Sequence, residues 1–199
     1  MRQNLRIAVA DDELDMREYL QEMLPILGHQ VVALAQDGQD LVHQCAEYRP
    51  DLVITDIKMP QLDGIEAALQ IHRKHPVPVI LVSAYHEADL LERAQAGHIL
   101  AYLVKPVKQA DLESAIHIAM RRFEQLQTLQ KEADNLRQAL EDRKVIERAK
   151  GMIMKQTGLD EESSFRRLQH LARTNNQKLV EIARSVMIAS DAMQVVDDS

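Results

Sequence analysis

Five polar side chains in the first half of the chain could do chemistry together. They comprise three carboxylates, one hydroxyl and one amine: Asp11, Asp12, Asp56, Ser83 and Lys105. Three carboxylates gathered in one cleft repel each other and need a cation, and an all-oxygen ligand set with room for water suits Mg²⁺. A lysine and a hydroxyl across such a site supply donors for the oxygens of a phosphoryl group. An aspartate there can act as the nucleophile and become an aspartyl phosphate.

These side chains lie at the ends of short apolar runs, so the fold decides whether they meet. Five such runs alternate with amphipathic segments of helical spacing, at residues 5–10, 30–35, 51–56, 78–83 and 99–104. Runs that are apolar on both sides are typical of a parallel sheet covered by helices on two faces. The sequence therefore predicts an α/β fold, with a five-stranded doubly wound parallel sheet and a helix after each strand.

Ligands of a doubly wound sheet bind at the carboxyl ends of the strands, near the point where the strand order reverses. All five polar side chains follow or close a predicted strand, so we expect them in one crevice. Asp56 ends the central run alone and is the candidate nucleophile, with Asp11 and Asp12 placed to hold the metal. Each residue has an ordinary alternative role, as a helix cap, a turn residue or, for Lys105, a surface lysine. Their joint occurrence at successive strand ends favours the site.

The rest of the chain is predicted to be helical. After Pro106 there is no further proline, and the only glycines are Gly151 and Gly158. A heptad seam of apolar residues steps by three and four through Leu126, Leu129, Ala133, Leu136 and Leu140. This seam predicts a short coiled coil. The alternative is one amphipathic helix that packs within its own chain.

Three apolar stripes at helical spacing follow the seam and predict a three-helix bundle. Gly158 suits the end of one helix, and Asp160 suits the start of the next. We therefore expect a domain at residues 1–120, a coiled-coil-like helical linker at 121–142, the bundle at 143–190 and a tail at 191–199.

Charge is distributed unevenly along the chain. Residues 1–120 carry 10 Lys and Arg against 18 Asp and Glu, whereas residues 143–184 carry 10 basic against 5 acidic residues. The bundle could therefore face a polyanion, although charged residues on helix exteriors are usually only a solvated surface. Its one aromatic residue, Phe165, falls on an apolar stripe, which argues against a general binder of single strands by base stacking.

The first 120 residues resemble a response-regulator receiver domain of two-component signalling. The motifs that carry the resemblance are VADDE, DLVITDIKMPQLDG, LVSAY and AYLVKP. The resemblance implies a sensor histidine kinase as the partner that donates the phosphoryl group. The implied roles are metal binding by Asp11, Asp12, Asp56 and the backbone carbonyl of Lys58; phosphorylation of Asp56; phosphate binding by Lys105; and switching by Ser83 and Tyr102.

Residues 143 to about 186 resemble an ANTAR domain, an RNA-binding antitermination module that follows receivers. The matching segments are RKVIERAKGMIMKQTGLDEESSFRRLQHLA and KLVEIA, with Ser164 where the family usually has alanine. The resemblance implies hairpin RNA in nascent transcripts as the target. The basic residues that are candidates for contacting it are Arg143, Lys144, Arg148, Lys150, Lys155, Arg166, Arg167, Arg173 and Lys178.

The two resemblances together predict a phosphorylation-dependent transcription antiterminator that forms a homodimer on phosphorylation and is not an enzyme acting on an outside substrate. Two alternatives remain for the bundle. Three small basic helices also describe a DNA-binding helix-turn-helix, and the bundle could equally be a protein-interaction module.

Several simpler features narrow the class of protein. No apolar run approaches the roughly 20 residues that a membrane span needs, and the first residues do not read as a signal peptide, so a cytoplasmic protein without membrane contact is expected. The single Cys45 is interpreted as a core residue. His72 and His75 are interpreted as surface residues at a helix end and not as metal ligands.

Overall fold

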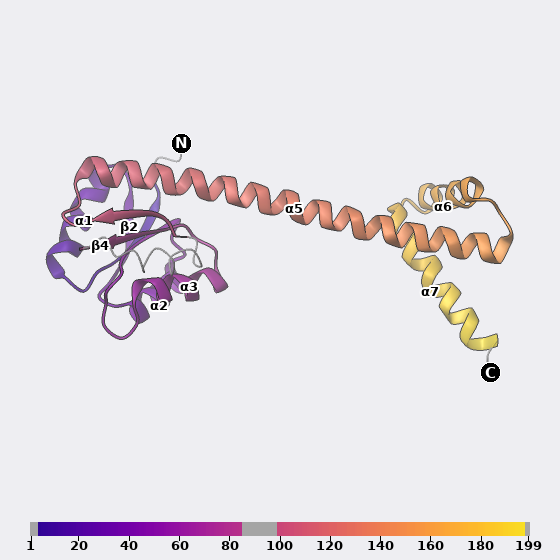
Figure 1. Cartoon of the computed structure of the whole chain (residues 1–199), viewed down its shortest axis with the longest axis horizontal. Helices are drawn as coiled ribbons and strands as arrows, with labels where there is room; N and C mark the ends of the chain where they lie inside the picture. Colours follow the sequence, from indigo (N-terminus) through magenta and orange to yellow (C-terminus); the bar gives the residue numbers. More distant parts are fainter. Residues whose placement is uncertain (1–3, 85–98, 198–199) are drawn as a thin grey trace. The chain divides into compact units, whose positions relative to one another are not determined.

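The computed structural model describes residues 4–84 and 99–197, of which the side chains are described up to residue 190 (Figure 1). The chain divides into two compact units, residues 1–128 and 129–199. The division falls inside one long helix, α5 (Gln109–Thr157). Each unit has its own core and is described by itself.

The first unit is built on a five-stranded sheet in which every pair of neighbours is parallel. The strand order is β2-β1-β3-β4-β5, so the order reverses at β1, which has β2 on one side and β3 on the other. The prediction of a doubly wound sheet is confirmed. The strands are β1 (Arg6–Ala10), β2 (Gln30–Ala35), β3 (Leu52–Asp56), β4 (Val79–Ser83) and β5 (Ile99–Val104).

Helices cover both faces of this sheet, because its strands are apolar on both sides. On one face, Leu20 and Leu24 of α1 and Leu112 and Ile116 of α5 enter one core cluster. On the other face, α2 and α3 contribute a second cluster that includes Cys45, and Figure 1 shows these two helices together below the sheet. The bounds are α1 (Leu14–Ile26), α2 (Gly38–Tyr48) and α3 (Gly64–Lys74).

Helix boundaries in this unit follow local chemistry. The carboxylates of Asp37 and Asp63 accept the backbone N–H groups of Asp40 and Glu66 and so cap α2 and α3. Gly28 adopts a φ of +84° just after α1, a conformation that favours glycine. The helix expected between the fourth and fifth strands falls on residues 85–98, which lie outside the described residues.

The cysteine and histidine predictions can also be compared with the structure. Cys45 is buried among apolar neighbours, and burial raises the pKa of its thiol to about 12, so it is a core residue as expected. His75 is exposed at the end of α3, whereas His72 is half-buried. Neither histidine belongs to a metal-binding group in the part of the chain that the structure describes.

The second unit is the predicted three-helix bundle. It consists of the C-terminal part of α5, α6 (Glu161–Asn175) and α7 (Leu179–Asp197). Its small core holds Ala149, Ile153, Leu168, Ala172, Ile182 and Ala183. Gly158, at a φ of +71°, ends α5, and the Asp160 carboxylate accepts the Ser163 N–H to begin α6, both as predicted. Phe165 is only half-buried.

The leucines of the heptad seam are exposed within the single chain. The exposed fractions are 44% for Leu126, 61% for Leu129, 67% for Leu136 and 59% for Leu140. The alternative of an amphipathic helix that buries this stripe in its own chain therefore does not hold for these four side chains. The single chain therefore leaves a row of leucines at coiled-coil spacing exposed to solvent.

Candidate functional site

The acidic residues meet where the strand order of the sheet reverses. Asp11 follows β1 and Asp56 ends β3, and these two strands are neighbours. The carboxylates of Asp11, Asp12 and Asp56 each bring an oxygen within 4.8 Å of the others. Asp11 and Asp56 are buried, with Asp56 only 7% exposed, whereas Asp12 faces solvent. The three aspartates that follow or close β1 and β3 therefore lie together at the carboxyl ends of these strands.

Lys105 brings a positive charge to the carboxylates of this cluster. Its Nζ atom lies 3.0 Å from Asp11 Oδ2 and 3.5 Å from Asp56 Oδ2. It also lies 3.1 Å from Oε1 of Glu13, a residue that the sequence reading did not single out. Burial lowers the pKa of Lys105, but hydrogen bonds to Asp11 and Glu13 outweigh burial and raise its pKa above the ordinary value. The lysine is therefore held in its charged form.

The positive charge near the two buried aspartates does not fully compensate for their burial. Burial raises the pKa of Asp11 above its ordinary value, although a backbone N–H and Lys105 oppose the rise. Burial also raises the pKa of Asp56, and the charge of Asp11 adds to the effect. Both directions mean that one lysine does not fully offset the cost of ionising this cluster.

A divalent cation fits this cluster. Oδ2 of Asp11 is buried, and the Lys105 ammonium group lies 3.0 Å from it. Burial still raises the pKa of Asp11, so this ammonium group does not fully offset the cost of ionising the carboxyl, and a further cation would lower that cost. Three carboxylates with one edge open to solvent give the few oxygen ligands, with water beside them, that Mg²⁺ prefers.

The loop after β1 holds Asp11 and Asp12 in place. The backbone N–H of Glu13 donates to Asp11 Oδ1 at 3.0 Å. Nη1 of Arg17 donates to the backbone carbonyls of Asp11 at 2.6 Å and Asp12 at 3.0 Å. Glu13 directly follows Asp11 and Asp12 in the sequence, and this proximity is the only sequence feature that points to it. Nothing in the sequence points to Arg17, because its contact depends on how the loop turns into α1.

The loop after β3 folds tightly over Asp56, and Gly64 makes that fold possible. A Cβ atom at Gly64 would lie 1.9 Å from the backbone oxygen of Asp56 and 3.0 Å from Oγ1 of Thr55. The Gly64 N–H donates to the Ile57 carbonyl at 2.9 Å, and the Ile57 N–H donates to Asp56 Oδ1 at 2.7 Å. Lys58 is an exposed residue of this loop. Asp-Gly pairs are common in turns, but the contact of Gly64 with Asp56 depends on the path of the loop.

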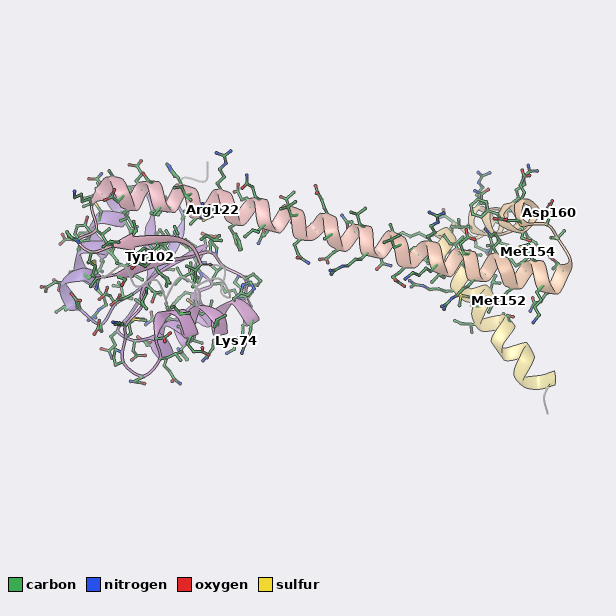
Figure 2. All side chains as sticks on the ribbon, viewed as in Figure 1. Lys74, Tyr102, Arg122, Met152, Met154 and Asp160 are labelled. Atoms are coloured by element: carbon green, nitrogen blue, oxygen red, sulfur yellow. The ribbon has the colours of Figure 1, made fainter. Side chains whose placement is uncertain are left out.

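Ser83 and Tyr102 lie near the cluster but not in it. Ser83 is buried at the carboxyl end of β4, and its backbone carbonyl accepts the Lys105 N–H at 2.8 Å. Tyr102 lies further back in β5, paired with Leu81, and packs against the core cluster on the α2 and α3 side (Figure 2). The strand ends thus bring together the three aspartates and Lys105, with Ser83 at the end of the neighbouring strand β4 and Tyr102 two residues before the end of β5.

The basic residues of the second unit fall into two groups. Lys150 is 10% exposed in its side chain and pairs with Glu147 at 2.5 Å and Glu161 at 2.7 Å, and hydrogen bonds to these two glutamates raise its pKa. Lys144 pairs with Glu141, Arg166 with Glu162 and Arg184 with Asp142. Exposed residues that form no ion pair in the described part of the chain are Arg143, Arg148, Lys155, Arg167, Arg173 and Lys178.

Each of the two units matches a known protein family. Residues 7–117 match the response regulator receiver domain, and residues 134–187 match the ANTAR domain. The transcriptional regulatory protein PdtaR of Mycobacterium tuberculosis (strain ATCC 25618 / H37Rv) is 39% identical over 182 residues, which is 92% of this chain and 89% of that protein.

Solved structures match the first unit. A response regulator receiver domain protein from Clostridium thermocellum is 31% identical, with a TM-score of 0.56, over 61% of this chain and 98% of that one. The receiver domain of the response regulator NarL from Mycobacterium tuberculosis, at 24% identity and a TM-score of 0.57, covers 60% of this chain and 98% of that one and shares the fold.

An acidic cluster with an adjacent lysine at the switch point of this sheet, together with these matches, defines the class as a response regulator with a receiver domain. More narrowly, the chain belongs to the response regulators that carry an ANTAR domain as an antiterminator-type output. Both domains are regulatory rather than catalytic, and receiver domains generally bind Mg²⁺ at an acidic pocket of this kind. The described residues include no helix that is both long and apolar enough to cross a membrane.

Proposed function

We propose that this protein is a cytoplasmic, phosphorylation-dependent response regulator that acts as an RNA-binding transcription antiterminator. The observation that carries the proposal is the arrangement of Asp56 beside Asp11, Asp12 and Lys105, in a chain whose second unit is an ANTAR domain. A sensor histidine kinase donates the phosphoryl group, and hairpin RNA in nascent transcripts is the target.

The residues of the acidic cluster would hold Mg²⁺. The ligands would be the side chains of Asp11, Asp12 and Asp56 and the backbone carbonyl of Lys58. When bound, the metal ion supplies positive charge next to the oxygens of the transferring phosphoryl group. The buried carboxyls of Asp11 and Asp56 support this assignment, because burial raises the pKa of both although Lys105 lies beside them.

Asp56 is the phosphoacceptor in this proposal. One of its carboxylate oxygens forms a bond to phosphorus while the bond between phosphorus and the donor histidine nitrogen breaks. Lys105, whose Nζ lies 3.5 Å from Asp56, then pairs with a phosphoryl oxygen, and the Ser83 hydroxyl donates to another. Because Ser83 and Tyr102 lie on neighbouring strands, movement of Ser83 toward the phosphoryl group is passed to Tyr102 as the switch.

The exposed seam of leucines connects this event to the output. Phosphorylation favours a homodimer in which the seam from Leu126 to Leu140 is covered by the same seam of a second copy. Two bundles are then available to bind paired hairpins in a nascent transcript, so that a terminator does not form. The phosphoryl group shifts the equilibrium only by its preference for the dimer-competent state.

Basic residues on the bundle surface supply the contacts to RNA. Six of these residues, Arg143, Arg148, Lys155, Arg167, Arg173 and Lys178, are exposed and pair with no carboxylate in the described residues. Their free charges support contacts to RNA phosphates. The paired residues Lys144, Lys150 and Arg166 were also candidates from the sequence. Of these three, Lys150 is the weakest candidate, since its side chain is nearly buried between two glutamates.

The class of output can be tested by binding. The purified full-length protein, treated with Mg²⁺ and an acyl phosphate as a small phosphoryl donor, is titrated against a two-hairpin RNA and a DNA duplex of matched length across a salt series. We expect tighter binding to the RNA, with an affinity that falls as salt rises. Preference for the duplex would favour a DNA-binding regulator, and binding to neither would indicate a protein-interaction module.

A further inference from the structure

Gly151 is an unexplained glycine in the second unit. Of the five glycines that the structure describes, Gly28 and Gly158 have positive φ, and a Cβ atom at Gly38 or Gly64 would collide with backbone atoms at 2.2 and 1.9 Å. Gly151 has neither reason. It lies inside α5, it is exposed, and an added Cβ would meet nothing within 4 Å. Glycine weakens a helix interior relative to alanine, so the fold of a single chain gives no reason for it.

The neighbours of Gly151 on the helix surface are basic. Residues three, four and seven positions away share a face of a helix, and at these spacings lie Arg148, Lys155 and Lys144, all exposed. Glu147 is also adjacent, but it pairs with Lys150 at 2.5 Å. Because Lys144 pairs with Glu141, the unpaired cations beside this bare stretch of helix backbone are Arg148 and Lys155.

This basic face points away from the core of the bundle. The side of α5 that enters the core carries Ala149 and Ile153. Gly151 is exposed, and an added Cβ atom there would meet nothing within 4 Å, so neither α6 nor α7 covers this side of the helix. The face is therefore accessible to a partner outside the bundle.

We propose that Gly151 is the point at which the sugar–phosphate backbone of RNA comes closest to α5, with Arg148 and Lys155 contacting phosphates on either side. These two residues are about 10 Å apart along the helix axis. The absence of a side chain between them lets a bulky, negatively charged strand lie against the helix itself. This proposal rests on the proposed RNA-binding function and adds the position of the contact.

Charge favours RNA over a second copy of this chain as the occupant. The apolar seam ends at Leu140, and the exposed face beyond it presents the unpaired cations Arg148 and Lys155. A second copy packed at Gly151 would bring the same cations together, which is unfavourable. The absence of an exposed aromatic platform in the described bundle, whose one aromatic residue is the half-buried Phe165, favours contact through the phosphates over base stacking.

Replacing Gly151 by larger residues tests this contact. The full-length protein, phosphorylated with an acyl phosphate and Mg²⁺, is titrated with the two-hairpin RNA as wild type, Gly151→Ala and Gly151→Leu. Because the site is open and glycine disfavours helix, both variants should fold with a melting temperature at or above that of the wild type. We expect the dissociation constant to rise by on the order of tenfold for Gly151→Leu and by less for Gly151→Ala.

Two control variants test separately whether the position of the added side chain and the charge beside it matter for RNA binding. Ala189→Leu places the same leucine side chain at an exposed site on α7 and should leave RNA affinity unchanged. Lys155→Gln should reduce the slope of log affinity against log salt by about one, as the loss of one phosphate contact predicts.

The outcomes separate this inference from the function on which it rests. If the wild type binds the RNA and Gly151→Leu binds it equally well, the contact at Gly151 is wrong while the RNA-binding function stands. If Gly151→Leu abolishes dimer formation in sedimentation and leaves RNA affinity per dimer unchanged, the glycine serves a protein contact and the inference is also wrong. If the wild type binds no RNA, both proposals fail together.

Discussion

At the scale of single residues, burial and charge decide what each polar side chain can do. Lys105 stays charged because Asp11 and Glu13 hold it, while Asp11 and Asp56 resist ionisation because burial is only partly offset. Lys150 is held in a similar way by two glutamates within the bundle, so its charge is already paired. A basic residue in the sequence is therefore a candidate for RNA only when the fold leaves its charge unpaired.

Ser164 provides a stability prediction at this scale. Its hydroxyl is fully buried and makes no hydrogen bond among the described residues. Ser164→Ala removes this unsatisfied group, so we expect the free energy of unfolding of the bundle to rise by about 1 kcal/mol. Urea denaturation followed by helical circular dichroism measures the change.

The neighbouring serine is a matched control with the opposite sign. The Ser163 side chain lies close enough to the Asp160 carboxylate at the start of α6 to lower the pKa of that carboxyl. Ser163→Ala loses this interaction and should lower the stability of the bundle in the same urea experiment. A Ser164→Ala protein less stable than the wild type would mean that the hydroxyl has a partner in solution.

At the scale of elements, successive parts of α5 have different roles. Its first turns place Leu112 and Ile116 in the receiver core, and its last turns place Ala149 and Ile153 in the bundle core. Between them the seam leaves Leu129 exposed. A helix that carries an uncovered apolar stripe between two separate cores is suited to pairing with a second copy.

Leu136→Glu tests the use of the seam. Because Leu136 is 67% exposed, the change should leave the fold of the single chain intact. In a seam dimer, two copies lose a buried leucine and gain facing like charges, so dimerisation of the phosphorylated protein should weaken on the order of a hundredfold or more. Sedimentation velocity measures this, with the exposed, off-seam Gln127→Glu as the control. A Leu136→Glu protein that dimerises like the wild type would show that the dimer uses another surface.

At the scale of the whole molecule, the sequence predicted what depends on local pattern. Apolar runs marked the strands, and aspartates at their ends marked the site, because a parallel sheet brings all its carboxyl ends to one edge. Contacts made across the fold had no such signal. The bond from Arg17 to the Asp11 carbonyl and the closure of Gly64 over Asp56 depend on loop paths that no periodicity records.

The same contrast between local patterns and contacts across the fold applies to the bundle. Gly158 and Asp160 marked the helix ends, because capping depends on neighbours in sequence. The burial of Lys150 was not foreseen, since its partner Glu161 comes from the next helix. Which basic residues remain free for a polyanion therefore required the packed bundle.

One measurement tests the central claim, which is control of RNA binding by phosphorylation of Asp56. The dissociation constant for the two-hairpin RNA is measured for the wild type and Asp56→Asn at one salt concentration, each with and without an acyl phosphate and Mg²⁺. We expect the phosphoryl donor to tighten binding by the wild type at least tenfold, with no effect on Asp56→Asn or after Mg²⁺ is removed with a chelator. Equal stimulation of the Asp56→Asn protein would contradict the account.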